Sequence, residues 1–212
     1  MLGDVTTASA DGVGEVIEGG VEVIEPVELS RAEAFLTHLS GVSRGGEPRL
    51  LKVDSTRPDV DPVFVLAFDD VPEPGMTTGI TYGVSLVDHA LLQGARPELC
   101  LTVQSTDDAW MWALGQIGEK LRGDCPFVLG STIDIGTPIT GDTEMSSLVV
   151  FAPAVLDRDD YEGIEVGQGD KITIVGIVPI HAAERRFIED HGLEEFWQLG
   201  WDMVDVTRAS IV

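Results

Sequence analysis

Residues 171–191, KITIVGIVPIHAAERRFIEDH, join an apolar strand to a charged helix and decide the fold class of this chain. β-branched and aliphatic side chains fill most of residues 171–178, as expected for a strand inside a sheet. Pro179 cannot donate a backbone hydrogen bond, so we predict that the strand ends there. A helix is predicted over residues 181–191, and a glycine separates it from a second helical stretch over residues 193–200.

Several strands and two more helices precede this unit. Runs of β-branched, aliphatic and aromatic residues predict strands over residues 50–53, 62–68, 79–84, 96–104, 131–135 and 147–152. Helices are predicted from Ser30 to Gly41 and over residues 108–122. Strands follow one another without a helix between each pair, which argues against strict βαβ alternation. We therefore predict an α+β fold, with a mixed, largely antiparallel β-sheet flanked by helices.

Both of these helices have recognisable ends. Ser30 and Glu33 fit a capping box at the start of the first helix. The second helix is capped by Thr106 or Asp107, and Arg122 at its C-terminal end opposes the negative pole of the helix dipole. Its buried face is predicted from residues at helical spacing, Met111, Leu114, Ile117 and Leu121, flanked by Trp110 and Trp112.

The chain carries a large excess of negative charge. Its 212 residues include 37 acidic and 13 basic ones, for a formal net charge of −24. A field of that sign repels phosphate backbones and anionic membrane surfaces, so we predict binding to neither nucleic acid nor membrane. The charge favours a basic protein partner, or serves solubility alone.

Composition also bounds the domain organisation. Residues 1–20 are rich in Gly, Ala, Thr and Asp and are predicted to form a flexible arm, and residues 21–212 a single domain. No cationic stretch followed by an apolar one opens the chain, so no signal peptide is predicted and the expected location is the cytoplasm. The two cysteines cannot form a disulfide framework, and Cys100 lies in an apolar run that predicts burial.

Five segments, in order, resemble the Suppressor-of-fused domain family. They are Thr77–Ser85 (TTGITYGVS), Arg96–Leu101 (RPELCL), the helix around Trp112–Gly118, Gly130–Ile139, and the C-terminal region with Ile177–Ile180, Glu184 and Val204–Ser210 (VDVTRAS). The resemblance covers about residues 50–212 and does not extend to residues 1–45.

The resemblance implies a non-catalytic protein without a cofactor. Animal members of this family bind and restrain a transcription factor in Hedgehog signalling, and stand-alone bacterial members are similar to immunity proteins of polymorphic toxin systems. The motif residues are expected to be structural: Thr81, Glu98, Pro179, Glu184, Asp205 and Arg208. Arg208 is predicted to form a buried bidentate pair with Asp205 or Glu98.

Two groups of residues are candidates for binding a partner. Asp157, Asp159, Asp160 and Glu162 form an acidic loop, for which a solvated surface is favoured over a weak calcium site. Trp197 and Trp201 stand four residues apart on the last predicted helix. If exposed they would anchor an interface, and core packing is the alternative interpretation.

A metal site at His181, Glu184 and His191 is disfavoured, because the third ligand would lie nearly three turns away. A helix cap is expected for His181, and a buried hydrogen bond or a salt bridge to Arg185 for Glu184. The sequence contains no nucleophile elbow and no phosphate-binding loop.

Three functions are compatible with these patterns. The favoured one is a bacterial immunity protein that occludes a basic toxin domain. The alternatives are a regulatory scaffold that binds an extended peptide along a sheet edge, and a small-molecule hydrolase with an unrecognised site.

Overall fold

A computed structural model describes residues 29–42, 46–89 and 96–212. The predicted flexible arm, residues 1–20, lies outside the described residues. Within these ranges no helix is long and apolar enough to cross a lipid bilayer.

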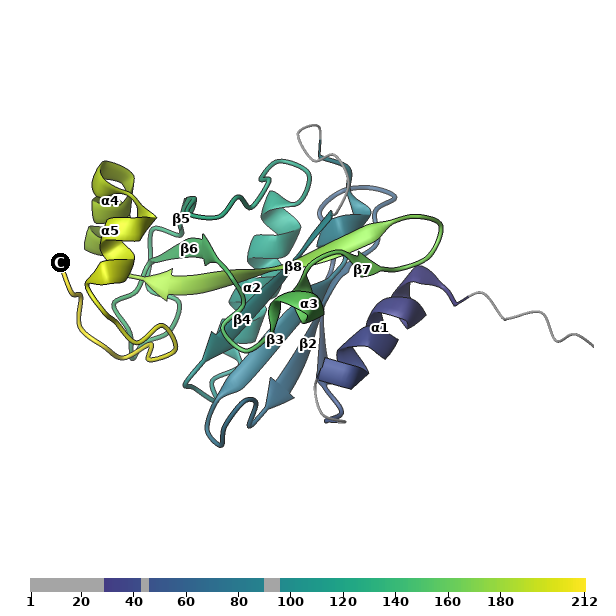
Figure 1. Ribbon diagram of the computed structural model, residues 1–212, viewed down its shortest axis with the longest axis horizontal. Helices are drawn as coiled ribbons and strands as arrows, with labels where there is room; N and C mark the ends of the chain where they lie inside the picture. Colours follow the sequence, from purple (N-terminus) through teal and green to yellow (C-terminus); the bar gives the residue numbers. More distant parts are fainter. Residues whose placement is uncertain (1–28, 43–45, 90–95) are drawn as a thin grey trace, which may run out of the picture.

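One mixed sheet of eight strands organises the molecule (Figure 1). The strands are β1 (Arg49–Val53), β2 (Val63–Asp69), β3 (Thr77–Tyr82), β4 (Arg96–Val103), β5 (Thr132–Asp134), β6 (Ser147–Phe151), β7 (Ile164–Glu165) and β8 (Lys171–Ile180). Their order is β1-β2-β3-β4-β8-β6-β5, and the short β7 pairs with β8. β4 and β8 run parallel and the other pairs antiparallel, which confirms the predicted mixed, largely antiparallel α+β fold.

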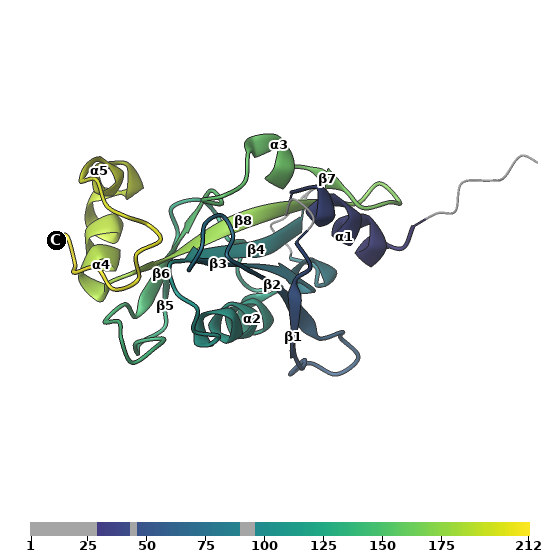
Figure 2. The same ribbon diagram turned by 90° about the horizontal axis from the view of Figure 1, so that it is seen from below.

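Helices cover both faces of this sheet and one of its ends. They are α1 (Arg31–Val42), the 3₁₀ turn η1 (Val84–Leu86), α2 (Ala109–Leu121), α3 (Arg158–Tyr161), α4 (Ala182–His191) and α5 (Leu193–Gln198). Figure 2 shows α2 on one face, with α1 and α3 on the opposite side. The pair α4 and α5 lies together at the end of the molecule towards which β8 runs (Figure 1).

Side chains of β8 alternate between the two faces of the sheet, so this strand contributes to all three clusters of the hydrophobic core. On one face, Ile172 packs in the cluster that contains Phe35 of α1. Farther along the same face, Val178 packs in the cluster that contains Phe196 of α5. On the other face, Ile177 belongs to the cluster beneath α2. This one strand therefore positions α4 and α5 relative to the rest of the sheet.

The predicted end of β8 was wrong by two residues. β8 continues through Pro179 to Ile180, and Pro179 stands opposite Leu148 of β6. On the other side of β8, the pairing with β4 reaches only as far as Gly176. On the side that faces β4, Pro179 therefore has no partner strand. Its missing N–H breaks no hydrogen bond between strands there.

The other predicted elements exist, with shifted ends. The strand predicted over residues 79–84 runs instead from Thr77 to Tyr82, and Val84–Leu86 forms the 3₁₀ turn η1. The short elements α3 and β7 were not predicted. Ser30 and Glu33 form the predicted capping box: the Glu33 carboxylate accepts the Ser30 N–H at 2.9 Å, and Ser30 Oγ accepts the Glu33 N–H at 3.3 Å.

Candidate functional site

A buried carboxylate lies between β3, β4 and η1. Glu98 is fully buried, and its Oε1 accepts hydrogen bonds from the N–H groups of Gly83 (2.9 Å) and Ser85 (3.0 Å) and from Ser85 Oγ (2.6 Å). Its Oε2 accepts a hydrogen bond from the Thr81 hydroxyl at 2.6 Å. The Thr81 hydroxyl oxygen in turn accepts a hydrogen bond from the Leu99 N–H at 2.7 Å. Burial raises the pKa of Glu98, and these hydrogen bonds oppose the rise. Two predicted motif residues, Thr81 and Glu98, are thus in direct contact.

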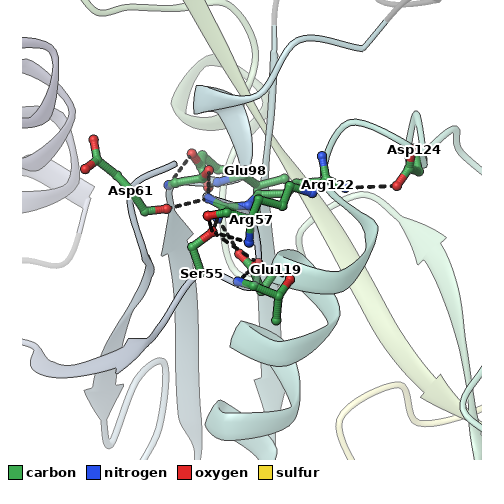
Figure 3. Close-up of polar contacts among 10 residues, drawn as sticks. Ser55, Arg57, Asp61, Glu98, Glu119, Arg122 and Asp124 are labelled. Atoms are coloured by element: carbon green, nitrogen blue, oxygen red, sulfur yellow. Dashed lines mark hydrogen bonds and ion pairs between the residues drawn. The ribbon is translucent and has the colours of Figure 1, made fainter. Parts of the chain in front are cut away.

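A buried arginine continues this network on the α2 side (Figure 3). The Arg122 guanidinium donates to the carbonyl oxygens of Asp61 (2.8 Å) and Gly83 (3.0 Å) and to Ser55 Oγ (2.9 Å), and it forms an ion pair with Glu119. Arg122 caps the C-terminal end of α2, where it was predicted to oppose the negative pole of the dipole, and its side chain is fully buried, which the sequence did not predict.

Gly83 connects these two charged centres. Its N–H donates to Glu98 while its carbonyl oxygen accepts from Arg122. Its φ of 125° is a conformation that side-chain-bearing residues rarely adopt, and a Cβ there would lie 2.8 Å from the Pro62 carbonyl oxygen. The charges of Glu98, Glu119 and Arg122 therefore fix turns inside the protein.

A second buried pair holds the C-terminal segment against α4. Arg208 donates to both carboxylate oxygens of Glu184, at 2.5 and 2.9 Å, and the Ile211 N–H donates to the same carboxylate at 3.1 Å. The predicted partners of Arg208 were wrong: Glu98 is bound elsewhere, and Asp205 accepts hydrogen bonds from the N–H and the hydroxyl of Thr207.

Glu184 also completes the cap of α4. The His181 N–H donates to Glu184 Oε2 at 2.9 Å, so His181 has the predicted cap position. Its Nε2 donates to the Arg208 carbonyl oxygen at 2.9 Å. Burial alone would raise the pKa of Glu184, but the hydrogen bonds from Arg208, His181 and Ile211 outweigh burial and hold this pKa below its ordinary value. The alternative of a salt bridge between Glu184 and Arg185 was wrong, since Arg185 pairs with Asp134 and Glu189.

The two candidate tryptophans have different surroundings. The Trp197 ring stacks on Phe151 with centroids 4.8 Å apart, yet 48% of the residue is exposed. Trp201 lies beyond the end of α5, with its ring 5.1 Å from that of Phe196, and the Arg208 guanidinium stands 4.9 Å above it. Trp201 therefore belongs to the packing of the C-terminal segment, whereas Trp197 offers an aromatic face to solvent.

The acidic loop forms α3 and its flanks. The Asp160 N–H donates to the Asp157 carbonyl oxygen at 2.9 Å, and Glu162 pairs with Arg158 at 2.5 Å. Asp157 and Asp159 are exposed around this short helix. Across the described residues, no group of three or more His, Cys, Asp or Glu side chains is arranged to hold a metal ion. The loop lies near Ile172 in β8, far along that strand from α5, so the structure does not bring the two candidate groups together (Figure 1).

A groove of about 800 Å³ lies beside α2. Its walls are α2, the chain from Val53 to Arg57 and residues 133–139. Ile117 and Ile133 contribute apolar lining, and no histidine or cysteine lies among the described residues that line it.

Almost all positive charge is neutralised within the molecule. The described ranges contain all Lys and Arg residues except Arg44, and ten of these twelve form ion pairs with carboxylates. The remaining two in these ranges are Lys120 and Arg186. Within the described ranges, most of the remaining carboxylates therefore face solvent without an ion-pair partner, whereas Glu98 is buried.

Solved structures with the same fold come from bacteria and animals. A SUFU homolog from Neisseria gonorrhoeae FA 1090 matches with a TM-score of 0.68 and 19% identity, over 84% of this chain and 95% of that one. Drosophila Suppressor of Fused matches with a TM-score of 0.64 and 14% identity, over 85% of this chain and 51% of that one. A chain of the Sufu–Fu complex matches with a TM-score of 0.60 and 13% identity, over 84% of this chain and 91% of that one.

The sequence comparison identifies the family. No curated protein matches the sequence significantly. The family model for Suppressor of fused protein (SUFU) matches residues 59–209, a range that contains every predicted motif residue. Because this match covers well over half of the chain, the protein belongs to the Suppressor of fused family.

Proposed function

We propose that this chain is a non-enzymatic protein-binding module, and that it acts as an immunity protein which neutralises a toxin domain of a polymorphic toxin system. A family relative has been solved as the Sufu–Fu complex, which supports a binding role for the domain. The match over 95% of the Neisseria homolog supports comparison with a bacterial relative.

The surface charge is the observation that carries the proposal. Ten of the twelve described cations are already paired within the molecule, while the net charge of the chain is −24. Such a surface attracts a strongly basic protein, such as a nuclease domain, and accelerates its association. By binding over the basic surface with which the toxin holds its substrate, the chain would block access to the active site. We place this action in the cytoplasm, where such a toxin domain would reach its target.

The alternative of a hydrolase has less support. That function predicts a pocket with convergent acids, bases or nucleophiles. The groove beside α2 is large enough for a small molecule, but Glu119 at its edge is already bound by the N–H and the hydroxyl of Thr56, at 2.7 and 2.9 Å.

Growth of cells tests the proposal. The genes beside this one are searched for a toxin domain, which is then expressed in a sensitive bacterium, alone and together with this chain. The toxin domain alone should arrest growth, and co-expression should restore it through a stable complex of the two proteins. Growth arrest that persists when both proteins are present in equal amounts would contradict the proposal, as would a genomic neighbourhood without a toxin gene.

A further inference from the structure

An exposed apolar patch surrounds Trp197 at the end of the molecule formed by α4 and α5. We call it the α5 patch and define it by Leu129, Phe151, Leu193 and Trp197. Trp197 and Leu193 stand four residues apart on α5, on the same side of that helix. Phe151 stacks on the Trp197 ring, so β6 extends the patch beyond the helix.

The turn before β5 completes the patch. The Gly130 N–H donates to the Val150 carbonyl oxygen at 2.8 Å, which fastens the turn beside Phe151. A Cβ at Gly130 would lie 3.6 Å from the Leu193 side chain, so the backbone of the turn reaches α5. Leu129 in this turn is 65% exposed. Exposed apolar side chains on neighbouring elements, here Leu129 beside Gly130 and Trp197 on α5, are typical of an interaction site.

Carboxylates border the patch. Glu194 and Glu195 are exposed in the first turn of α5. Glu189 of α4 reaches the start of β5, where it accepts a hydrogen bond from Thr132 Oγ1 at 2.9 Å. Arg185 is nearby, but its guanidinium is occupied by Asp134 and Glu189. An apolar centre with an acidic border is complementary to a segment that has apolar side chains flanked by Lys or Arg.

Charge also distinguishes between the possible occupants. A second copy of this chain would bring its own net charge of −24 against the same acidic border. Residues 1–28 of the chain contain seven acids and neither Lys nor Arg, so they meet the same repulsion. A basic partner is instead attracted by these carboxylates, although the exposed Arg186 of α4, which forms no ion pair in the described ranges, stands close to Glu189.

We infer that the α5 patch is the anchoring site for the partner, and that it binds a basic amphipathic segment of that protein. The inference rests on the proposed function and names the site through which it would act. Trp197 and Leu129 supply the apolar anchors, which usually dominate binding energy, while the carboxylates at the border orient the basic residues. The acidic loop at α3 attracts the same partner over longer distances but lacks apolar anchors of this kind.

A designed peptide tests this site in the full-length protein. The probe is a synthetic amphipathic helix of about 18 residues, made of Leu and Lys. A second peptide replaces each Lys with Glu and keeps every Leu. Binding is followed by NMR, through the backbone amides of Leu129 and Gly130 and the indole N–H of Trp197. The Lys peptide should shift these signals, and the Glu peptide should leave them in place.

Matched variants separate the patch from exposed apolar residues elsewhere. Leu129→Ser and Trp197→Ser should each weaken binding of the Lys peptide by about tenfold or more. The controls are Leu50→Ser and Trp112→Ser, because Leu50 is 63% and Trp112 is 44% exposed, close to their counterparts in the patch. These two substitutions should leave the affinity unchanged.

Three other results would overturn the inference in distinguishable ways. Shifts confined to α3 or to the groove beside α2, with Leu129→Ser binding normally, would relocate the site and leave the proposed basic partner in place. No binding of the Lys peptide at low salt would contradict the inference and the proposed partner chemistry together. A dimer in sedimentation experiments that Leu129→Ser dissolves would assign the patch to a second copy of the chain.

Discussion

The guanidinium of Arg208 holds both carboxylate oxygens of Glu184, at 2.5 and 2.9 Å, across 24 residues of chain. Both side chains are largely removed from water. The pair fastens the C-terminal segment, which has no helix or strand of its own, to the first turn of α4. Since α4 and α5 carry much of the proposed binding surface and its border, this contact also affects where that surface lies.

Removal of Arg208 should destabilise the protein strongly. Arg208→Ala leaves the buried Glu184 carboxylate without its cation, and losses from broken buried pairs are about 3–5 kcal/mol. Arg186→Ala is the matched control, because Arg186 lies on α4 near Glu184 and forms no ion pair in the described structure. Thermal unfolding should show a much lower Tm for the first variant than for the second. Equal Tm values would show that the pair contributes nothing to folding.

Glu184 should also govern part of the acid sensitivity. Its pKa is held below the ordinary value of 4.5, so its contribution to stability is fully present above that pH. The contribution is lost as the pH falls through the lower pKa of the folded state. In urea unfolding, Glu184→Gln should be clearly less stable than the wild type at neutral pH, and the difference should shrink in acid. A difference that stays constant with pH would contradict this linkage.

Arg122 should be more important for stability than any surface base. Arg122→Met removes hydrogen bonds to the carbonyl oxygens of Asp61 and Gly83 and leaves Glu119 buried without its cation. We expect a loss of about 3–5 kcal/mol in chemical unfolding. Lys120→Met, two residues earlier and exposed, is the control and should change stability little. A double variant with Glu119→Met should lose less than the sum of the two single variants, and strict additivity would exclude coupling between the pair.

The two cysteines should differ in reactivity. Cys100 is buried between β3 and β8, and burial raises its pKa to about 12. Cys125 is partly exposed. A thiol-specific reagent should therefore modify Cys125 in the native protein and reach Cys100 only after unfolding. Mass spectrometry of the labelled peptides measures both sites, and fast native labelling of Cys100 would mean that the sheet opens readily.

Local sequence patterns were sufficient for the main elements of the fold. In β2, β4, β8 and α2 the apolar pattern is long enough to indicate a strand or a helix. The predicted ends of each element lie within a few residues of the observed ends. α3 and β7 have four and two residues, too few for any period. Pro179 was predicted to end β8, but a proline is tolerated in a strand where no neighbouring strand needs its N–H. That condition depends on where β4 stops pairing with β8, and the sequence of β8 alone does not show it.

The candidate site was harder to predict, because burial depends on contacts between distant segments. Arg122 follows a helix end, where an exposed basic residue is common. Its burial depends on Gly83 and Asp61, whose carbonyl oxygens accept hydrogen bonds from its guanidinium. Trp197 and Trp201 have helical spacing, but α5 ends at Gln198, so only Trp197 lies on the helix and the two rings meet edge to face with centroids 6.3 Å apart. The exposure of Leu129 beside α5 depends on the turn that Gly130 fastens to β6, and the sequence contains no local sign of it.

The association of this chain with the toxin domain that the proposal expects among the neighbouring genes tests the central claim most directly. Association rates would be measured by surface plasmon resonance at about 50 mM and about 500 mM NaCl, between which the Debye length falls severalfold. We predict fast binding at low salt that slows by at least about tenfold at high salt. Leu129→Ser should keep that salt dependence but dissociate faster. Absence of binding, or an association rate indifferent to salt, would contradict an acidic module that captures a basic partner.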